Sequence, residues 1–316
     1  MSQYLNLKRI EFIVTYRCNS HCKHCHVEAA KRVSRPRALT PELAERAVRE
    51  LAGAYTLSYV MTFGGEPLLF PRTVCAVHAI ARECGIPGRS IITNAGFPVG
   101  EAEFREVAQS LVESGVNGIC ISVDAFHQEY IPLAVVRQNV RLLAEAGIEE
   151  LKWNPCWVVS RDHDNPWNAR TRLVLEELAD LPVQPDDGDV TLLPEGQALV
   201  YLAEYLPPRQ DLPVGTCGDK PYTGRLDEII SITVEPDGSL TICDENMSIG
   251  SMGQRDAAEI CQAYDPYQMP IHRAILEGGL AGLAEMAHQR GIQPDPAGYY
   301  SVCGMCKALR RELVTG

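Results

Sequence analysis

Short apolar runs alternate with stretches of amphipathic helical periodicity along the first two thirds of the chain. The apolar runs predict strands over residues 10–14, 59–63, 90–93, 118–123, 151–159 and 190–193. The helical periodicity predicts helices over residues 41–53, 71–83, 101–114, 133–146 and 168–179. Because strand–helix alternation of this kind produces a parallel sheet with right-handed crossovers, we predict an α/β fold. Six such units over residues 1–206 suit a partial, TIM-like (β/α)6 barrel.

The last third of the chain has a different pattern, since the strand–helix alternation stops near residue 206. Two short β runs, over residues 230–234 and 240–242, flank Pro236-Asp237-Gly238. Pro-Asp-Gly is a strong turn signal, so the two runs predict a β-hairpin. Helical stretches follow over residues 255–263 and 271–289. We therefore predict a second unit over residues 207–316, a small C-terminal α+β domain.

Composition and charge are those of an ordinary globular protein. Hydrophobic residues make up 46% and charged residues 22% of the 316 residues, which suits a barrel with a smaller appendage. The net charge of −12 argues against a general nucleic-acid or membrane-surface protein. The chain starts without the apolar core of a signal peptide, and no run reaches the roughly 18 apolar residues of a spanning helix. We therefore expect a cytoplasmic protein with neither a nucleic-acid nor a membrane partner.

The candidate chemistry begins with cysteine. Twelve cysteines in a chain without an export signal indicate metal ligation rather than disulfides. Cys18, Cys22 and Cys25 follow the spacing Cys-x3-Cys-x2-Cys on one short segment. Three thiolates there can hold three irons of a cubane cluster, which leaves the fourth iron open to a small molecule. The alternatives are a zinc site, with a histidine of the same segment as fourth ligand, and a group of unrelated buried cysteines.

The cysteine segment resembles that of the radical S-adenosylmethionine (SAM) enzymes. Their pattern is Cys-x3-Cys-x-φ-Cys, where φ is often aromatic, and His24 stands at φ here. The resemblance implies a 4Fe–4S cluster on Cys18, Cys22 and Cys25 whose open iron binds the amino and carboxylate groups of SAM. One electron then breaks the sulfonium and yields a 5′-deoxyadenosyl radical, chemistry that the cofactor carries and the protein positions.

Later segments resemble the cofactor motifs of the same family. Gly64-Gly65-Glu66-Pro67 resembles the GGEP motif at the end of the second strand, where glycines let the backbone approach a ligand closely. Residues 91–96, with Ala95 inserted, resemble a third-strand Thr-Asn-Gly motif, and residues 119–124 resemble a fourth-strand Ser-x-Asp motif. Residues 193–196 resemble a sixth-strand region that contacts the cofactor. These resemblances imply SAM-binding roles for Gly64, Gly65, Glu66, Pro67, Thr93, Asn94, Ser122, Asp124 and Glu195.

A second set of cysteines lies in the C-terminal third: Cys217 before the predicted hairpin, Cys243 at its end, and the pair Cys303 and Cys306. The arrangement resembles the SPASM and twitch extensions of radical SAM enzymes and implies one auxiliary 4Fe–4S cluster with these four ligands. A structural zinc site with the same ligands is the alternative. The remaining cysteines fall in predicted core elements and are expected to be buried: Cys75, Cys84, Cys120, Cys156 and Cys261.

The resemblance leaves the substrate open. Peptide epimerases of this superfamily have a hydrogen-donating cysteine beside the hairpin ligand, where this chain has Asp244, and a carboxylate cannot donate a hydrogen atom. Many peptide-modifying relatives also begin with a peptide-recognition domain, for which we expect no room before Cys18. We therefore predict a small-molecule substrate in specialised metabolism, with nucleoside or sugar-acid decarboxylation as one candidate reaction. A ribosomal-peptide-modifying enzyme such as an epimerase, and a non-catalytic metal-binding or redox-sensing protein, are the alternatives.

Two further expectations concern partners. Candidate substrate contacts lie at the open side of the strand ends: Phe97, His127, Trp153, Asn154 and Glu195. Basic residues gather around the first cysteines, against the acidic total: Arg17, Lys23, Lys31, Arg32, Arg35 and Arg37. They form a solvated loop face, a docking patch for an acidic electron donor such as flavodoxin, or a contact surface for an acidic substrate.

Overall fold

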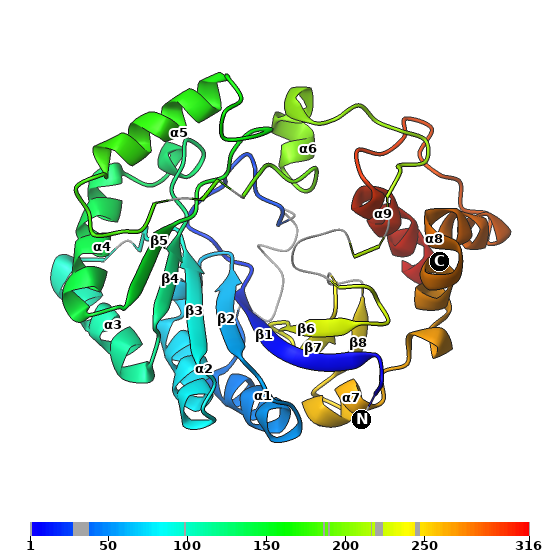
Figure 1. The fold of residues 1–316 in the computed structure, drawn as a ribbon, viewed down its shortest axis with the longest axis horizontal. Coiled ribbons are helices and arrows are strands. Elements are labelled where there is room, and N and C mark those ends of the chain that lie inside the picture. The colour runs from blue at the N-terminus through cyan, green and yellow to red at the C-terminus, as the bar shows by residue number, and fades with distance from the viewer. Residues whose placement is uncertain are drawn as a thin grey trace.

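A curved sheet frames the protein (Figure 1). The computed structural model describes residues 2–27, 38–97, 99–185, 187–188, 190–215, 217–218, 224–243 and 247–315. Successive strands pair in parallel through β1 (Leu5–Thr15), β2 (Tyr59–Gly64), β3 (Gly88–Thr93), β4 (Gly118–Ile121) and β5 (Glu150–Trp153). The helices that follow these strands lie on the outer side of the sheet: α1 (Pro41–Ala54), α2 (Pro71–Glu83), α3 (Glu101–Ser114), α4 (Leu133–Ala146) and α5 (Pro166–Glu177).

The predicted alternation of strands and helices is confirmed in this region. The structure has α2, α3 and α4 at the predicted bounds and lengthens the first strand at both ends. Thr40 caps α1, since its side chain accepts a hydrogen bond from Leu43 N at 3.3 Å, and Pro41 occupies the first turn. Gly115 ends α3 with a φ of 92°, a left-handed conformation that favours glycine. Local capping chemistry therefore sets these helix limits.

The predicted C-terminal hairpin extends the sheet from its other edge. β6 (Ile229–Val234) pairs in parallel with β1, and β7 (Ser239–Thr241) pairs in the antiparallel direction with β6. β8 (Ser248–Ser251) follows as the antiparallel neighbour of β7. The complete strand order is β5-β4-β3-β2-β1-β6-β7-β8. The hairpin is confirmed, and its strands continue the sheet of the barrel.

The predicted sixth strand over residues 190–193 is wrong. The run lies between Gly188 and Pro194, which favour turns and leave only a few residues for pairing. Within the described chain, Thr191 makes an isolated parallel bridge with Trp157 and joins no strand. β6 takes the next parallel position, beside β1 rather than beside β5. Gln184 makes a further parallel bridge with Lys152 of β5, so the chain after α5 touches the β5 edge at isolated positions without forming a regular strand there.

Helices make up much of the C-terminal third. They are α7 (Ala257–Gln262), α8 (Pro270–Gln289) and α9 (Val302–Thr315), and the short α6 (Ala198–Tyr201) precedes them. The sequence pattern predicted α7 and α8 but missed α9, which carries Cys303 and Cys306. Gly279 interrupts α8 with a φ of 59° and produces a kink. Among the described residues, we find no helix that combines the length and the apolar character needed to cross a bilayer.

Apolar side chains of the C-terminal third pack into the same core as the first strand and helix. Leu5, Val48, Ile232 and Leu309 are buried members of this core. A second apolar core joins α3 and α4 to the strands β3 to β5. Burial of apolar surface is the dominant favourable contribution to folding, so the C-terminal elements support the barrel itself. The domain division at residue 206 stays a prediction.

Candidate functional site

The first cysteine segment follows directly after β1, at the carboxyl end of that strand. Cys22 is 5% exposed, and Cys18 and Cys25 are half-buried. A turn closes the segment, in which Cys25 N donates to Cys22 O at 3.1 Å. Burial raises the pKa of Cys22, and the charges of Asp124, Cys18 and Cys25 add to the rise. The three thiols therefore share a volume in which a positively charged ligand would stabilise their deprotonated forms.

The glycines of the GGEP segment pass directly under this cysteine segment. A Cβ atom on Gly65 would lie 2.0 Å from the carbonyl oxygen of Arg17, and one on Gly64 would lie 2.4 Å from that of Thr15. Gly65 N donates to Thr15 O at 2.7 Å, and Glu66 N donates to Arg17 O at 2.8 Å. Only glycine permits so close an approach of two backbones. The end of β2 therefore positions the start of the cysteine segment.

Glu66 is completely buried and links the ends of β2 and β3. Its Oε1 accepts hydrogen bonds from Leu68 N at 2.9 Å and from Thr93 Oγ1 at 2.8 Å, and its Oε2 accepts one from Asn94 N at 2.8 Å. Burial raises the pKa of Glu66, while these hydrogen bonds oppose the rise. Pro67 then begins a 3-10 turn over Pro67–Leu69. The contacts of this carboxylate in the structure are with protein, and its contact with SAM stays a prediction.

Asn94 connects the third strand to the cysteine segment. Its Nδ2 donates to Asn19 Oδ1 at 2.8 Å and lies 3.8 Å from Cys18 Sγ. Asn19 Nδ2 in turn donates to Gly96 O at 2.7 Å, and Gly96 N donates to Asn94 Oδ1 at 2.8 Å. The inserted Ala95 has a φ of 50°, which is unusual for a residue with a side chain. This network ties the region around Cys18 to the end of β3.

Asp124 forms a second buried hub at the end of β4. Its Oδ1 accepts hydrogen bonds at 2.9 Å from Phe126 N, His127 N and His127 Nδ1. Its Oδ2 accepts one from Cys156 N at 3.0 Å, beyond the end of β5. Burial alone would raise the pKa of Asp124, but His127 and these hydrogen bonds bring it below its usual range. Ser122, the other residue of this motif, donates its backbone N to Thr93 O at 2.8 Å.

His24 lies in an aromatic cluster beside Cys22. Its ring centroid is 4.8 Å from that of Phe126 and 4.9 Å from that of His127. Burial lowers the pKa of His24 to about 4, so the ring is neutral at pH 7. Its Nδ1 is buried without a hydrogen-bond partner among the described residues. One ligand atom from each of Cys22, His24 and His127 lies within 4.8 Å of the others, which also suits a single ion.

Phe126, Trp167 and Gln197 at this site were not predicted from the sequence, whereas Lys23 belongs to the basic group and Gly196 to the segment 193–196 named above. Phe126 stacks on Trp167 at 4.8 Å, and Lys23 Nζ lies 4.7 Å above the Trp167 ring. Gly196 has a φ of 56°, and a Cβ there would lie 2.4 Å from Cys25 O. Its neighbour Gln197 donates its N to the same oxygen at 2.9 Å. The position of Gly196 beside the predicted Glu195 was the available sequence signal.

The predicted substrate contacts differ in their surroundings. Trp153 is buried in the core of the barrel, and Phe97 packs against the same core. Asn154 is half-buried and donates its backbone N to Ile121 O at 2.8 Å. His127 is half-buried and held by Asp124, as described above. Whether any of them touches a substrate stays a prediction.

Three cysteines of the second set, Cys217, Cys303 and Cys306, lie near one another where α9 meets the segment before the hairpin. Burial raises the pKa of Cys217 to about 11, and the charges of Cys306 and Cys303 add to the rise. Arg310 Nε donates to Cys306 Sγ at 3.3 Å within α9. Cys243, at the hairpin end, is exposed, and Asp244 lies outside the described residues. Of the cysteines expected to be buried, Cys156 and Cys261 are buried, Cys75 and Cys120 are half-buried, and Cys84 is exposed.

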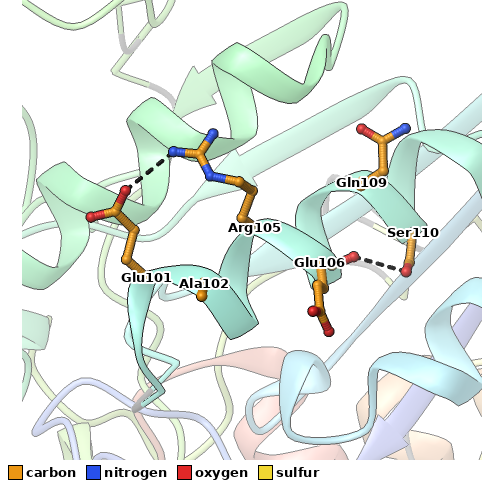
Figure 2. A pocket seen from close by; sticks show the side chains of 6 residues that line it. All are labelled: Glu101, Ala102, Arg105, Glu106, Gln109 and Ser110. Carbon is orange, nitrogen blue, oxygen red and sulfur yellow. Dashed lines mark hydrogen bonds and ion pairs between the residues drawn. The ribbon is translucent and has the colours of Figure 1, made fainter.

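A surface hollow on α3 lies apart from these sites. Figure 2 shows its lining, formed by Glu101, Ala102, Arg105, Glu106, Gln109 and Ser110. All of them are exposed residues of one helix, and Arg105 pairs with Glu101 at 3.2 Å. The predicted site residues lie instead on the strand ends of the sheet. The hollow therefore plays no part in the candidate site.

The fold and the site define an open α/β barrel with a three-cysteine segment at the carboxyl ends of its strands. Residues 12–166 match the Radical SAM superfamily model, so this part of the chain is a radical SAM domain. The domain implies a 4Fe–4S cluster and SAM as cofactors, and reductive cleavage of SAM as its general chemistry. The cysteines fit such a cluster, because thiolate sulfur is the ligand that iron–sulfur clusters take from proteins.

Curated relatives and solved structures agree with this domain. The GTP 3′,8-cyclase of Pseudomonas fluorescens (strain Pf0-1) is 26% identical over 184 residues, which are 55% of this chain and 53% of the relative. That of Trichormus variabilis is 32% identical over 124 residues, which are 39% of this chain and 34% of the relative. The chain thus spans about half or less of the length of these relatives. The structure of native anSMEcpe with bound AdoMet shares the fold, with a TM-score of 0.53, 13% identity and coverage of 98% and 97% of the two chains.

Proposed function

We propose that this protein cleaves SAM reductively at a 4Fe–4S cluster held by Cys18, Cys22 and Cys25, and abstracts a hydrogen atom from a small molecule. The observation that carries the proposal is the network at the strand ends. Glu66 links β2 to Asn94, and Asn94 reaches both Asn19 and the sulfur of Cys18. A cofactor bound at the cysteines would therefore be held on rigid strand ends, as barrel enzymes require.

The cysteine segment suits a cluster better than a single ion. A zinc ion with Zn–S bonds of about 2.3 Å would draw its sulfur ligands to within about 4 Å of one another. Among the described residues, only Cys22, His24 and His127 bring three ligand atoms within 4.8 Å, and this trio leaves Cys18 and Cys25 out. A cubane places each sulfur on a different iron and so needs wider spacing. Once bound, such a cluster supplies the electron that breaks the sulfonium of SAM.

Four of the predicted SAM contacts belong to two neighbouring strand ends: Thr93 and Asn94 at the end of β3, and Ser122 and Asp124 after β4. Asn94 lies beside Cys18, and Asp124 is close enough to Cys22 for its charge to add to the rise of that thiol's pKa that burial causes. The side chains of Glu66, Thr93, Asn94 and Asp124 already make protein contacts, so we propose that they shape the SAM site mainly by holding the backbone of the strand ends. Gly64, Gly65, Pro67 and Glu195 complete the proposed cofactor set.

We also propose an auxiliary 4Fe–4S cluster on Cys217, Cys243, Cys303 and Cys306, in a C-terminal unit of the SPASM or twitch type. Cys306 and Cys303 lie close enough to Cys217 for their charges to add to the rise of its pKa that burial causes, which supports a shared site. A structural zinc site with the same four ligands is the alternative. Cys243, which is exposed at the hairpin end, is the fourth proposed ligand.

Two observations support a small-molecule substrate. The curated relatives are named for action on GTP, a nucleotide, and they match more than half of this chain at best. Asp244 also stands where an epimerase would need its second cysteine. We therefore propose a nucleoside-like or sugar-acid substrate, with decarboxylation as the first reaction to test. Peptide modification, such as epimerisation, is the second candidate.

The electron donor is part of the same proposal. Lys23 pairs with Glu129 at 2.6 Å and lies over Trp167, so its charge already has protein partners. Lys31, Arg32, Arg35 and Arg37 lie outside the described residues. We propose that this basic run receives an acidic donor such as flavodoxin.

Anaerobic reconstitution with iron and sulfide, followed by an assay for 5′-deoxyadenosine, tests the proposed function. The wild-type protein should form 5′-deoxyadenosine from SAM and dithionite, and Cys22→Ser should form none. Cys84→Ser, at an exposed cysteine, is the matched control and should behave as wild type. If the wild type binds metal but never forms 5′-deoxyadenosine, the non-catalytic redox-sensing alternative is correct.

Candidate substrates are then compared in deuterated water. A nucleoside or sugar acid that loses carbon dioxide only with SAM present supports the small-molecule reading. Deuterium at the inverted α-carbon of a test peptide would instead establish the peptide reading.

A further inference from the structure

Arg310 is a buried cation in contact with the second cysteine set. The side chain lies in the middle of α9, and the residue is only 2% exposed. Its Nε donates to Cys306 Sγ at 3.3 Å, across one turn of the helix. Burial of an arginine is rare unless a partner compensates its charge. The sulfur of Cys306 accepts a hydrogen bond from this cation, and as a metal-ligating thiolate it would also carry a compensating negative charge.

Two further groups of the second cysteine site, Cys217 and His272, lie near Arg310. Arg310 and Arg225 both favour the charged form of Cys217, against burial and against Cys306 and Cys303. His272, which is 4% exposed, lies close enough for Arg310 to disfavour its protonation. Both ring nitrogens of His272 lack a hydrogen-bond partner among the described residues. A buried guanidinium therefore lies beside the sulfurs of this site.

A positive charge beside the sulfurs would affect the reduction potential of an iron–sulfur cluster bound there. The reduction potential of an iron–sulfur cluster depends on its net charge, on hydrogen bonds to its sulfurs and on solvent exposure. A buried guanidinium that donates to a ligating sulfur acts through the first two of these. Because reduction adds one electron to the cluster, a nearby positive charge favours the reduced form and raises the potential.

We propose that Arg310 is a positioning residue of the second cysteine site, where it orients Cys306 and raises the reduction potential of the cluster bound there. The inference rests on the auxiliary cluster of the proposed function. It adds that the protein tunes this cluster toward accepting an electron, through a side chain that ligates no iron. Such tuning serves a cluster that exchanges electrons, and it has no use in a cluster that only stabilises the fold.

The experiment isolates the second cluster in a background with Cys18, Cys22 and Cys25 all changed to Ala. Arg310→Gln and Arg310→Lys are placed on this background, and redox titration with dithionite is followed by electron paramagnetic resonance. Arg311→Gln is the matched control, because Arg311 is the next residue of α9 and is exposed. Arg310→Gln should shift the midpoint potential to more negative values. Arg310→Lys, which keeps the charge, should give a smaller shift, and Arg311→Gln should give the smallest.

The outcomes separate this inference from the proposed function. If the triple background retains no iron–sulfur signal, the auxiliary cluster itself is wrong, and the inference fails with it. If the cluster is present and Arg310→Gln shifts the potential no more than Arg311→Gln, only the role of Arg310 is overturned. Should Arg310→Gln fail to fold, Arg310→Lys decides alone: a changed potential or spectrum supports the contact with Cys306, and values equal to those of the background overturn it.

Discussion

The two cysteine regions of this protein are built in different ways. In the first, each side of the segment meets the end of another element: Gly65 under Arg17, Asn94 beside Cys18, and Gln197 on Cys25. In the second, one helix supplies both Cys303 and Cys306, three residues apart and so on one helical face. The first site is therefore held by the sheet, whereas the second depends on α9 and on segments that reach it from elsewhere.

This difference bears on what each site can do. Rigid strand ends hold groups accurately enough for chemistry, because small displacements of reacting groups are costly. A site gathered from a helix and connecting segments can bind a cluster well without such accuracy. We therefore expect the first region to govern cleavage of SAM and the second to govern electron exchange and the stability of the C-terminal third.

The largest expected effect comes from removing one cysteine set at a time. Changing Cys18, Cys22 and Cys25 together to Ala should abolish 5′-deoxyadenosine formation and leave about half of the iron, because two clusters with about four irons each are expected. Changing Cys303 and Cys306 together to Ser should also remove about half of the iron but leave measurable cleavage of SAM. Iron analysis and chromatography of the nucleoside products measure both.

Other iron contents in these variants would contradict the assignment of one cluster to each cysteine region. If the first variant loses all its iron, the second site does not bind a cluster independently. If zinc replaces iron at the second site of the wild type, the two-cluster reading is wrong.

The second prediction concerns the close contact under the first site. Gly65→Ala places a Cβ atom 2.0 Å from a backbone oxygen, so the strand end or the cysteine segment must move. We expect a fall of about 100-fold in the rate of 5′-deoxyadenosine formation, with iron content nearly unchanged. Gly53→Ala is the control, because a Cβ at Gly53 meets nothing within 4 Å. That variant, within α1, should keep wild-type cleavage and gain up to about 1 kcal/mol of stability. Equal cleavage rates in the two variants would show that the segment adapts.

The cysteines and the GGEP segment of the first site could be predicted from sequence spacing. The contacts that hold them in place could not. The cysteine spacing and the Gly64-Gly65-Glu66-Pro67 segment carry their meaning in a few adjacent residues, and capping residues such as Thr40 mark helix limits locally. The partners of Asn94 and Asp124 lie 75 and 32 residues away along the chain, at Asn19 and Cys156. No local pattern predicts such pairs.

The fold shows the same division. Helix bounds and the C-terminal hairpin were predictable because caps and the Pro-Asp-Gly turn act locally. The place of β6 beside β1 was not, since it depends on packing that buries Ile232 and Val234 in a core shared with Leu5. α9 was missed as well, although it carries two of the second set of cysteines.

The third prediction concerns the buried carboxylate between the two strand ends. Glu66→Gln keeps the shape of the side chain. Its amide NH2 group, however, would face one of the N–H or O–H groups that donate hydrogen bonds to the carboxylate in the wild type. We expect a loss of about 1–3 kcal/mol in the free energy of unfolding and weaker SAM binding, with both clusters retained. Glu106→Gln, on the exposed face of α3, should change neither. Calorimetric titration with SAM on the reconstituted proteins measures the affinity, and a wild-type value in folded Glu66→Gln would move the cofactor site elsewhere.

The smallest expected effect is a pH dependence of stability that originates beneath the first site. His78 in α2 is completely buried, and its Nε2 lies 3.0 Å from Oγ1 of Thr62 in β2. Burial, and secondarily the charge of Arg89, lowers the pKa of His78 to about 3. Below the unfolded pKa of about 6.5 the unfolded chain binds a proton that the folded protein refuses, so stability falls as the pH drops from about 6.5 toward 3.

Chemical denaturation between pH 7.5 and 4.5 should therefore show a flatter pH dependence in His78→Gln, whose amide can still bond Thr62 but does not titrate. The expected difference is about 2 kcal/mol over this interval, since each pH unit within the window contributes at most about 1.4 kcal/mol. His288→Gln, at an exposed position of α8, is the control in the other region and should leave the slope unchanged. Identical slopes for wild type and His78→Gln would mean that this histidine has the same pKa in the folded and the unfolded protein. The strand that carries the glycines of the first site would then contact a residue that takes up a proton without loss of stability, and the contrast between a rigid first region and an adaptable second one would lose its support.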